Sequence, residues 1–251
     1  MKKLLQILNI LFFTATIYVN YASSVGLFNN STQAAISGKY QTLFTPASYG
    51  FSIWGIIYLL LLGFVIYQSR SLFVSVSDDR FIEKTGGWFI LSCIANSLWC
   101  YLFVCDYILL STFVILFILF CLLQIVLRNK IKRYKAPITT IVFLWWPFII
   151  YSGWLTVACI ANVTIYLTKI GWDGWGLSPQ GWTFILIGIA TLLNLIVTWR
   201  QNMREFALVG AWGLVAIGVA NTESYQAITQ MAYVCAGLLI VSCGIHAIKS
   251  K

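Results

Sequence analysis

Charged residues are scarce in this sequence, and acidic ones are the scarcest. Asp and Glu together number 7 of 251 residues, all charged residues make up 9%, and His246 is the single histidine. Hydrophobic residues make up 60% of the chain, well above their share in soluble domains. This composition excludes an ordinary soluble globular protein and indicates an integral membrane protein.

The sequence also lacks the patterns typical of metal, disulfide and nucleic-acid sites. Its seven cysteines form no C-x-x-C pair and mostly fall in apolar runs, where thiols behave as small apolar side chains. His246 stands alone, whereas a metal or haem site needs several converging ligands. The net charge of +9 comes from basic residues at the ends of apolar runs, so we expect no nucleic-acid partner.

Long apolar runs dominate what is present. A helix needs about 20 mostly apolar residues to cross the roughly 30 Å hydrocarbon layer of a bilayer. Eight runs approach that length, at residues 4–22, 49–69, 87–104, 107–127, 139–167, 181–199, 205–220 and 226–248. We therefore predict an all-α integral membrane protein, a bundle of about eight transmembrane helices. Spans three and four should form a tight antiparallel hairpin at Cys105 and Asp106.

The basic residues predict the orientation of these spans, because short loops rich in Lys and Arg stay on the cytoplasmic side. With eight spans, 14 of the 16 basic residues fall on one side, and only Lys39 and Lys169 fall on the other. We expect a multi-pass protein of a bacterial inner membrane with both termini cytoplasmic and loop 128–135 against anionic lipid headgroups. Alternatively, the first run is a secretory signal peptide cleaved near Ala22, which would leave seven spans.

The interiors of the predicted spans contain no Asp, Glu, Lys or Arg. Ion-coupled transporters and proton pumps ordinarily carry such groups at mid-membrane depth, so an ion-driven carrier is disfavoured. The segments outside the spans are too short for a soluble domain, and no acid, base or nucleophile arrangement indicates an enzyme. Function is therefore expected inside the membrane or at its surface.

Tryptophan is abundant, at 11 residues, and three motifs place aromatic and polar residues on one helix face each. The motifs are Trp54 and Tyr58 (i, i+4), Asn96, Trp99 and Phe103 (i, i+3, i+7), and Trp154, Ala158 and Asn162 (i, i+4, i+8). One interpretation is packing between spans, with the asparagines bonding across helices. The other is an aromatic pocket for a flat apolar ligand, whose polar groups would pair with indole N–H groups and asparagine amides.

Together with Pro46, these motifs resemble the signatures of the TspO/MBR family, the tryptophan-rich sensory proteins of bacteria and the mitochondrial translocator protein. The resemblance implies a five-helix bundle over residues 1–168 and a three-helix extension over residues 169–251. It also implies a pocket for a porphyrin, haem or sterol-like molecule, with no required cofactor, lined by Trp54, Asn96, Trp99, Trp154 and Ala158. The loop at 23–48 has none of the family's tryptophans, so the ligand's identity stays open.

We therefore expect a membrane-embedded protein that binds a planar apolar ligand, in first place a tetrapyrrole, for sensing, sequestration or transport, and we expect no enzymatic activity. Two alternatives stay open: a passive or exchange transporter of another small hydrophobic molecule, and a structural or regulatory membrane protein without a ligand. The Ala- and Gly-rich helix at 205–220 should pack closely against another helix. That helix would belong to this chain or to a second copy in a homodimer.

Overall fold

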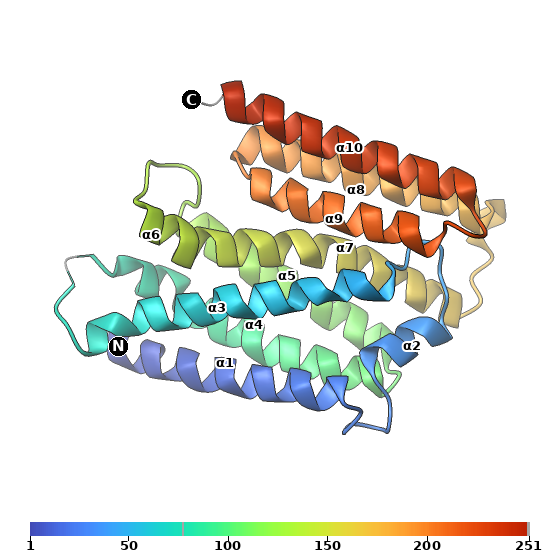
Figure 1. Cartoon of the computed structure of the whole chain (residues 1–251). Helices are drawn as coiled ribbons and strands as arrows, with labels where there is room; N and C mark the ends of the chain where they lie inside the picture. The colour runs from blue at the N-terminus through green and yellow to red at the C-terminus, as the bar shows by residue number, and fades with distance from the viewer. Residues whose placement is uncertain (77, 250–251) are drawn as a thin grey trace. The chain divides into compact units, whose positions relative to one another are not determined.

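A computed structural model describes residues 1–76 and 78–249, and these residues form helices joined by short loops, with no strand among them (Figure 1). Each predicted apolar run is a helix, because a helix satisfies its own backbone hydrogen bonds where water is absent. Seven helical segments of the described chain are long and apolar enough to cross a membrane: Lys2–Ser24, Ser48–Leu72, Arg80–Val104, Ile108–Arg128, Ile138–Lys169, Pro179–Gln201 and Gln226–Lys249.

The chain divides into two compact units, Met1–Ile36 with Gly55–Ser152 and Ser37–Trp54 with Gly153–Lys251. The first unit holds α1 (Lys2–Ser24), most of α2 (Gln33–Lys39) and α3 (Ile53–Ser69), η2 (Arg70–Leu72), α4 (Arg80–Val104), α5 (Ile108–Arg128), α6 (Ile138–Thr140), η3 (Ile141–Trp145) and the start of α7 (Trp146–Lys169). The second holds η1 (Ser48–Ser52), the rest of α7, η4 (Gly174–Gly176), α8 (Pro179–Gln201), α9 (Arg204–Ala220) and α10 (Gln226–Lys249). The predicted boundary at 168/169 rests on family resemblance rather than on compactness, and it stays a prediction.

Aromatic packing forms the core of the first unit. The ring of Phe64 in α3 lies 5.1 Å from that of Phe89 in α4 and 4.9 Å from that of Phe148 in α7, both in edge-to-face geometry. All three side chains are fully buried. Edge-to-face pairs of this kind stabilise helix contacts beyond the burial of apolar area, so this cluster joins three of the spans.

Two irregularities in the first unit have clear sequence causes. Gly86 interrupts α4 with φ of 51°, a left-handed conformation that glycine adopts without steric cost, and the regular span begins after it as predicted. The π-helical turn η3 ends just before Pro147. Proline has no N–H and clashes with the carbonyl four residues earlier, and a π-turn accommodates this defect.

The predicted hairpin between spans three and four is confirmed. Helix α4 ends at Val104 and α5 begins at Ile108, and the two helices pack against each other. Asp106 in the turn has φ of 65°, a left-handed conformation that aspartate tolerates better than most residues. The chain therefore reverses within three residues.

Helices α8, α9 and α10 lie side by side in the second unit (Figure 1). A Cβ added at Gly218 of α9 would come within 2.5 Å of Tyr233 Cε1 in α10, and one added at Gly210 would overlap Asn194 of α8. Small residues let the helix backbones approach this closely. The predicted close packing of the 205–220 helix is thus confirmed, and its partners are two helices of the same chain.

Helix α9 has 17 residues, at the lower limit for a span. The C-terminal ends of its neighbours lie together, since Trp199 Nε1 donates a hydrogen bond of 2.9 Å to Ser242 Oγ and Lys249 lies over the Trp199 ring. Helices α8 and α10 therefore run in the same direction, and α9 must return the chain between them over about 26 Å. This geometry supports α9 as the eighth span.

Candidate functional site

The predicted site residues are distributed over the two compact units. Those in the first unit are Tyr58, Asn96, Trp99 and Phe103, and those in the second unit are Pro46, Trp54, Trp154, Ala158 and Asn162. Each group has a defined local environment within its own unit.

Asn96 is the centre of a buried polar cluster in the first unit. Its Oδ1 accepts a hydrogen bond of 2.7 Å from Asn20 Nδ2 in α1, and its Nδ2 donates one of 2.6 Å to the Tyr151 hydroxyl in α7. The cluster extends to Cys100, whose thiol donates to Asn20 Oδ1 at 3.2 Å. Both ends of the Asn96 amide thus bond across helices, which favours the packing interpretation for this residue.

Tyr58 reaches the same cluster from α3. Its hydroxyl is buried and interacts with Asn96 and Tyr151, whereas the residue as a whole is only half-buried. The phenol therefore has a polar end inside the unit and a ring face near its surface.

Trp99 and Phe103 form a stacked pair in α4, with ring centroids 5.2 Å apart and ring planes at 27°. Both side chains are buried. The predicted spacing therefore places them on one face, where they pack against each other.

In the second unit, Trp154 is buried and lies in edge-to-face geometry with Phe51 at a centroid distance of 6.1 Å. Asn162 is buried, while Trp54 and Ala158 are half-buried. The aromatic motifs of α3 and α7 that fall in this unit thus lie in a packed environment, with the η1 ring of Phe51 as the observed partner of Trp154.

Pro46 belongs to a segment that α9 holds in place. Ala47 N–H donates to the Ala216 carbonyl at 3.0 Å, and Trp212 Nε1 donates to the Gly50 carbonyl at 3.1 Å. Asn221 Nδ2 adds a bond of 2.9 Å to the Leu43 carbonyl. The chain entering α3 is therefore anchored by side chains and backbone of the C-terminal third.

An open groove of about 890 Å³ runs between α1 and α3 in the first unit. Its walls are almost entirely apolar, and Tyr58 is the only predicted site residue among them. The lining residues are Ile10, Phe13, Thr14, Ile17, Gly55, Tyr58, Leu59, Leu62, Val65, Ile66, Ser69, Arg70 and Phe73. The volume lies within the usual range for small-molecule sites, roughly 300–1,000 Å³.

The α1 wall of this groove was not predicted from the sequence. Ile10, Phe13, Thr14 and Ile17 follow the i, i+3, i+4, i+7 pattern of one helix face. That pattern carries little information in α1, since apolar residues also cover its other faces. Only the packing of α1 beside α3 shows which face lines the groove.

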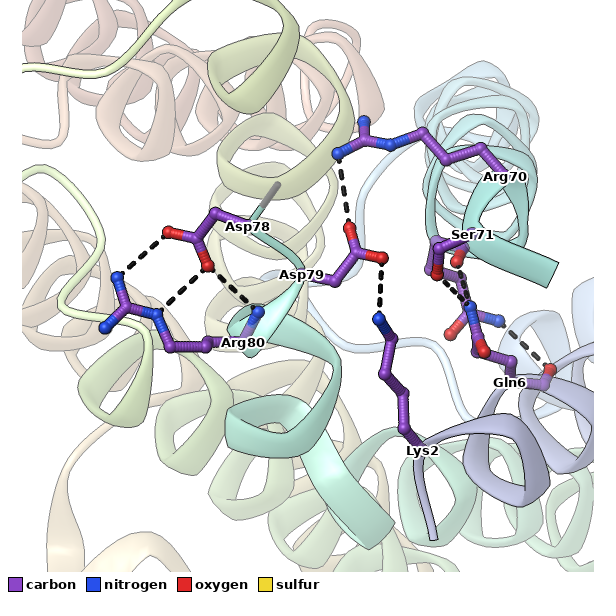
Figure 2. A network of polar contacts seen from close by, with 8 residues as sticks. Lys2, Gln6, Arg70, Ser71, Asp78, Asp79 and Arg80 are labelled. Atoms are coloured by element: carbon purple, nitrogen blue, oxygen red, sulfur yellow. Dashed lines mark hydrogen bonds and ion pairs between the residues drawn. The ribbon is translucent and has the colours of Figure 1, made fainter. Parts of the chain in front are cut away.

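A charged network holds the end of the groove where Arg70 lies (Figure 2). Asp79 directly precedes α4, and its carboxylate forms ion pairs with Lys2 Nζ at 2.9 Å and with Arg70 Nη2 at 3.3 Å. Gln6 of α1 donates hydrogen bonds to the Gln68 carbonyl and to Ser71 Oγ. These contacts make α1 a wall of the first unit.

The two carboxylates near this network have lowered pKa values. Burial by itself raises the pKa of Asp79, but hydrogen bonds from Ser71 and Lys2 and the nearby positive charges outweigh it, so its pKa falls below the ordinary value. Hydrogen bonds from Arg80 lower the pKa of Asp78 to about 2. Both groups are therefore ionised at neutral pH. Within residues 1–76 and 78–249, no group of three or more His, Cys, Asp or Glu side chains could hold a metal ion.

Comparison with known proteins gives one match. A family model described as "TSPO-like protein" matches residues 6–245. No curated protein and no solved structure matches the chain significantly. The family match includes the C-terminal helices that the resemblance treated as an extension.

Proposed function

Because the chain belongs to the TSPO-like protein family, we propose that this multi-pass membrane protein binds a planar apolar molecule, with a tetrapyrrole as the leading ligand. The observation that carries the proposal is the open apolar groove between α1 and α3. It lies along helices long enough to cross a membrane, so a ligand dissolved in the lipid reaches it without passing through water.

The chemistry of the groove suits a flat apolar body with an acidic edge. Its lining offers few polar groups, and Arg70 is the only charged one. The half-buried ring of Tyr58 presents an aromatic face, and its hydroxyl is buried beside the cluster around Asn96. A partly buried ring suits stacking, since ordering it on binding costs little additional entropy. Tetrapyrroles with carboxylate side chains combine these two properties.

A second placement of the same ligand follows the sequence motifs. In it, the ligand would stack on Trp54, Trp99 and Trp154, with Asn96 or Asn162 pairing with its polar groups. Both ends of the Asn96 side-chain amide are already hydrogen-bonded to Asn20 and Tyr151, which weighs against this placement. We propose binding, for sensing, sequestration or transport, rather than catalysis. A passive transporter of another hydrophobic molecule remains the second candidate, because the groove is open and apolar along its length.

The test is equilibrium binding of haem, protoporphyrin and perylene to purified protein in detergent, followed by ligand absorbance and tryptophan quenching. Leu62→Trp fills the groove, and Leu116→Trp on α5 is its matched control, because both leucines are 44% exposed and only Leu62 lines the groove. We expect saturable porphyrin binding that Leu62→Trp weakens about ten-fold or more and that Leu116→Trp leaves unchanged.

Trp154→Ala separates the two placements. Loss of binding in this variant, with Leu62→Trp behaving as wild type, would move the ligand from the groove to the tryptophan motifs. Weak, unsaturable quenching that is equal for all three compounds would sink the porphyrin proposal. Flux of a porphyrin across liposomes containing the protein would favour transport over sequestration.

A further inference from the structure

A second, smaller pocket lies at the charged end of the first unit, outside the apolar groove except for the shared Arg70. Its volume is about 320 Å³, the lower end of the range for small-molecule sites. We call it the basic pocket, and its lining residues are Tyr67, Arg70, Val76, Asp78, Arg80, Phe81, Lys84, Asn129, Tyr134, Pro137, Thr140 and Leu144. It therefore gathers side chains from the ends of α3 and α5, the start of α4 and the segment entering α7.

Positive charge exceeds negative charge around this pocket. Asp78 is occupied by Arg80, through bonds of 3.1 Å from Nε and 3.0 Å from Nη2. Asp79 is shared by Lys2 and Arg70 (Figure 2).

Lys84 brings the local count to four cations for two carboxylates, a net charge of +2. Lys84 is exposed. Its charge acts on the carboxylate of Asp78 by electrostatic attraction without a direct ion pair. The basic loop at 128–135, which supplies two of the lining residues, adds further positive charge. The pocket thus attracts an anion.

Asn129 gives the pocket a second, independent requirement. Its side chain is 3% exposed, and its Nδ2 donates to Thr85 Oγ1 at 3.1 Å and to the Ile125 carbonyl at 3.0 Å. Its Oδ1 is buried and accepts no hydrogen bond from any described residue. A buried acceptor without a donor is rare, so a ligand that completes this site should carry a hydroxyl or another donor.

An aromatic wall makes the pocket rigid. The ring of Tyr67 stacks with that of Phe81, at 5.5 Å, and with that of Phe143, at 5.4 Å, and the guanidinium of Arg70 lies 3.6 Å from its centroid. Arg70 is therefore held at a fixed position by Tyr67 on one side and Asp79 on another. A preorganised cation binds an anionic group with little loss of side-chain entropy.

We propose that the basic pocket binds the phosphate ester of a polyol, supplied by the headgroup of an anionic phospholipid such as phosphatidylglycerol. The phosphate lies against Lys84 and Arg70, and a headgroup hydroxyl donates to Asn129 Oδ1. The lipid, rather than a soluble phosphate, is the source because the pocket lies where spans end among Lys and Arg residues, at the level expected for headgroups. Arg70 also lines the apolar groove, which offers a surface for an acyl chain.

The test compares lipid retention and thermal stabilisation of the purified full chain in detergent. The probes are phosphatidylglycerol, phosphatidic acid, which lacks the headgroup glycerol and its alcohol groups, phosphatidylcholine, and free glycerol 3-phosphate as the soluble source. Lys84→Gln removes a cation that lines the pocket. Lys135→Gln is its matched control, an exposed lysine of the basic loop that does not line the pocket.

We expect phosphatidylglycerol to be retained above the other three probes, and Lys84→Gln to weaken it about five-fold while Lys135→Gln has no effect. Asn129→Leu should abolish the preference for phosphatidylglycerol over phosphatidic acid. If this variant does not fold, two results test the proposal instead. They are the preference of the wild type for phosphatidylglycerol over phosphatidic acid, and the difference between Lys84→Gln and Lys135→Gln. Equal effects of the two lysine variants, or equal retention of phosphatidylcholine, would overturn the proposal. If free glycerol 3-phosphate stabilised the protein as strongly as phosphatidylglycerol does, the proposal that a lipid supplies the phosphate ester would be wrong.

The porphyrin experiment and this one can be told apart, although Arg70 lines both sites. Lys84 and Asn129 do not line the apolar groove, and Leu62 does not line the basic pocket. Failure of the headgroup proposal is therefore read from the Lys84→Gln and Asn129→Leu variants, and failure of the porphyrin proposal from Leu62→Trp.

Discussion

Asn96 and Asp79 are buried polar residues of similar size in the first unit, but one is neutral and the other is charged. Asn96 lies on the helix face that its spacing with Trp99 and Phe103 predicts, yet its amide is saturated by Asn20 and Tyr151. A neutral amide with both ends bonded costs little to bury. Asp79 is 5% exposed and keeps its charge because two cations and Ser71 surround it. Its ionisation is thus coupled to the docking of α1.

We predict that Asp79→Asn lowers the free energy of unfolding by about 1.5–3 kcal/mol at neutral pH, the contribution of hydrogen bonds to a charged group. The pKa of Asp79 is depressed in the folded protein, so its stabilising effect is full above the unfolded pKa, about 3.9. The effect is lost as pH falls through the lower folded pKa. Thermal unfolding in detergent between pH 7 and pH 2 measures the difference between variant and wild type.

Glu83→Gln is the control for this prediction, because Glu83 is an exposed acid in the first turn of the same helix. Its unfolding profile should follow that of wild type. A constant difference between Asp79→Asn and wild type across the whole pH range would show that the ion pairs do not stabilise the fold.

At the scale of the helices, close approach in the second unit depends on glycines at particular positions of α9. Gly210 faces α8 and Gly218 faces α10, and neither position has room for a Cβ. Gly188 in α8 meets nothing within 4 Å. Composition alone does not separate these glycines, because all three sit inside apolar helices. Their difference arises from the helix that each one faces.

We predict that Gly218→Ala destabilises the protein by about 1–3 kcal/mol, because the new methyl group would push Tyr233 away and open the contact between α9 and α10. Gly188→Ala should be neutral or stabilising by up to about 1 kcal/mol, since alanine is the better helix former. Thermal unfolding in detergent compares the two. Equal effects of both substitutions would contradict the packing of α9 described above.

At the scale of the whole chain, the positions of the basic residues predict the orientation of the spans. In the second unit, Lys39 and Lys169 both lie near the ring of Tyr40, at 5.0 and 5.7 Å from its centroid. These are the two basic residues assigned to the non-cytoplasmic side. Lys249 lies instead over Trp199, at the end where α8 terminates. Within the second unit these three lysines are therefore grouped as the eight-span topology predicts, and the orientation in the membrane stays a prediction.

We predict that reporters fused after residues 133, 202 and 249 face the cytoplasm, and that reporters after residues 39, 171 and 223 face the opposite side. Paired reporters with activity confined to one compartment, such as a phosphatase and a fluorescent protein, measure this. The pair at 202 and 223 tests α9 directly. Reporters on the same side at these two positions would show that α9 does not cross the membrane and would place the C-terminus outside.

The sequence by itself determined the helical membrane class, the approximate limits of the apolar helices, the α4–α5 hairpin and the family. These features depend on local properties: apolar length, the positions of Lys and Arg, and short motifs with fixed spacing. Only the tertiary structure decided that Asn96 bonds to Asn20 and Tyr151, that the segment at 37–54 attaches to α9, and that α1 and α3 enclose an apolar groove. Helices apolar on every side carry no marker of which face meets which, so these contacts emerge only when the side chains pack together.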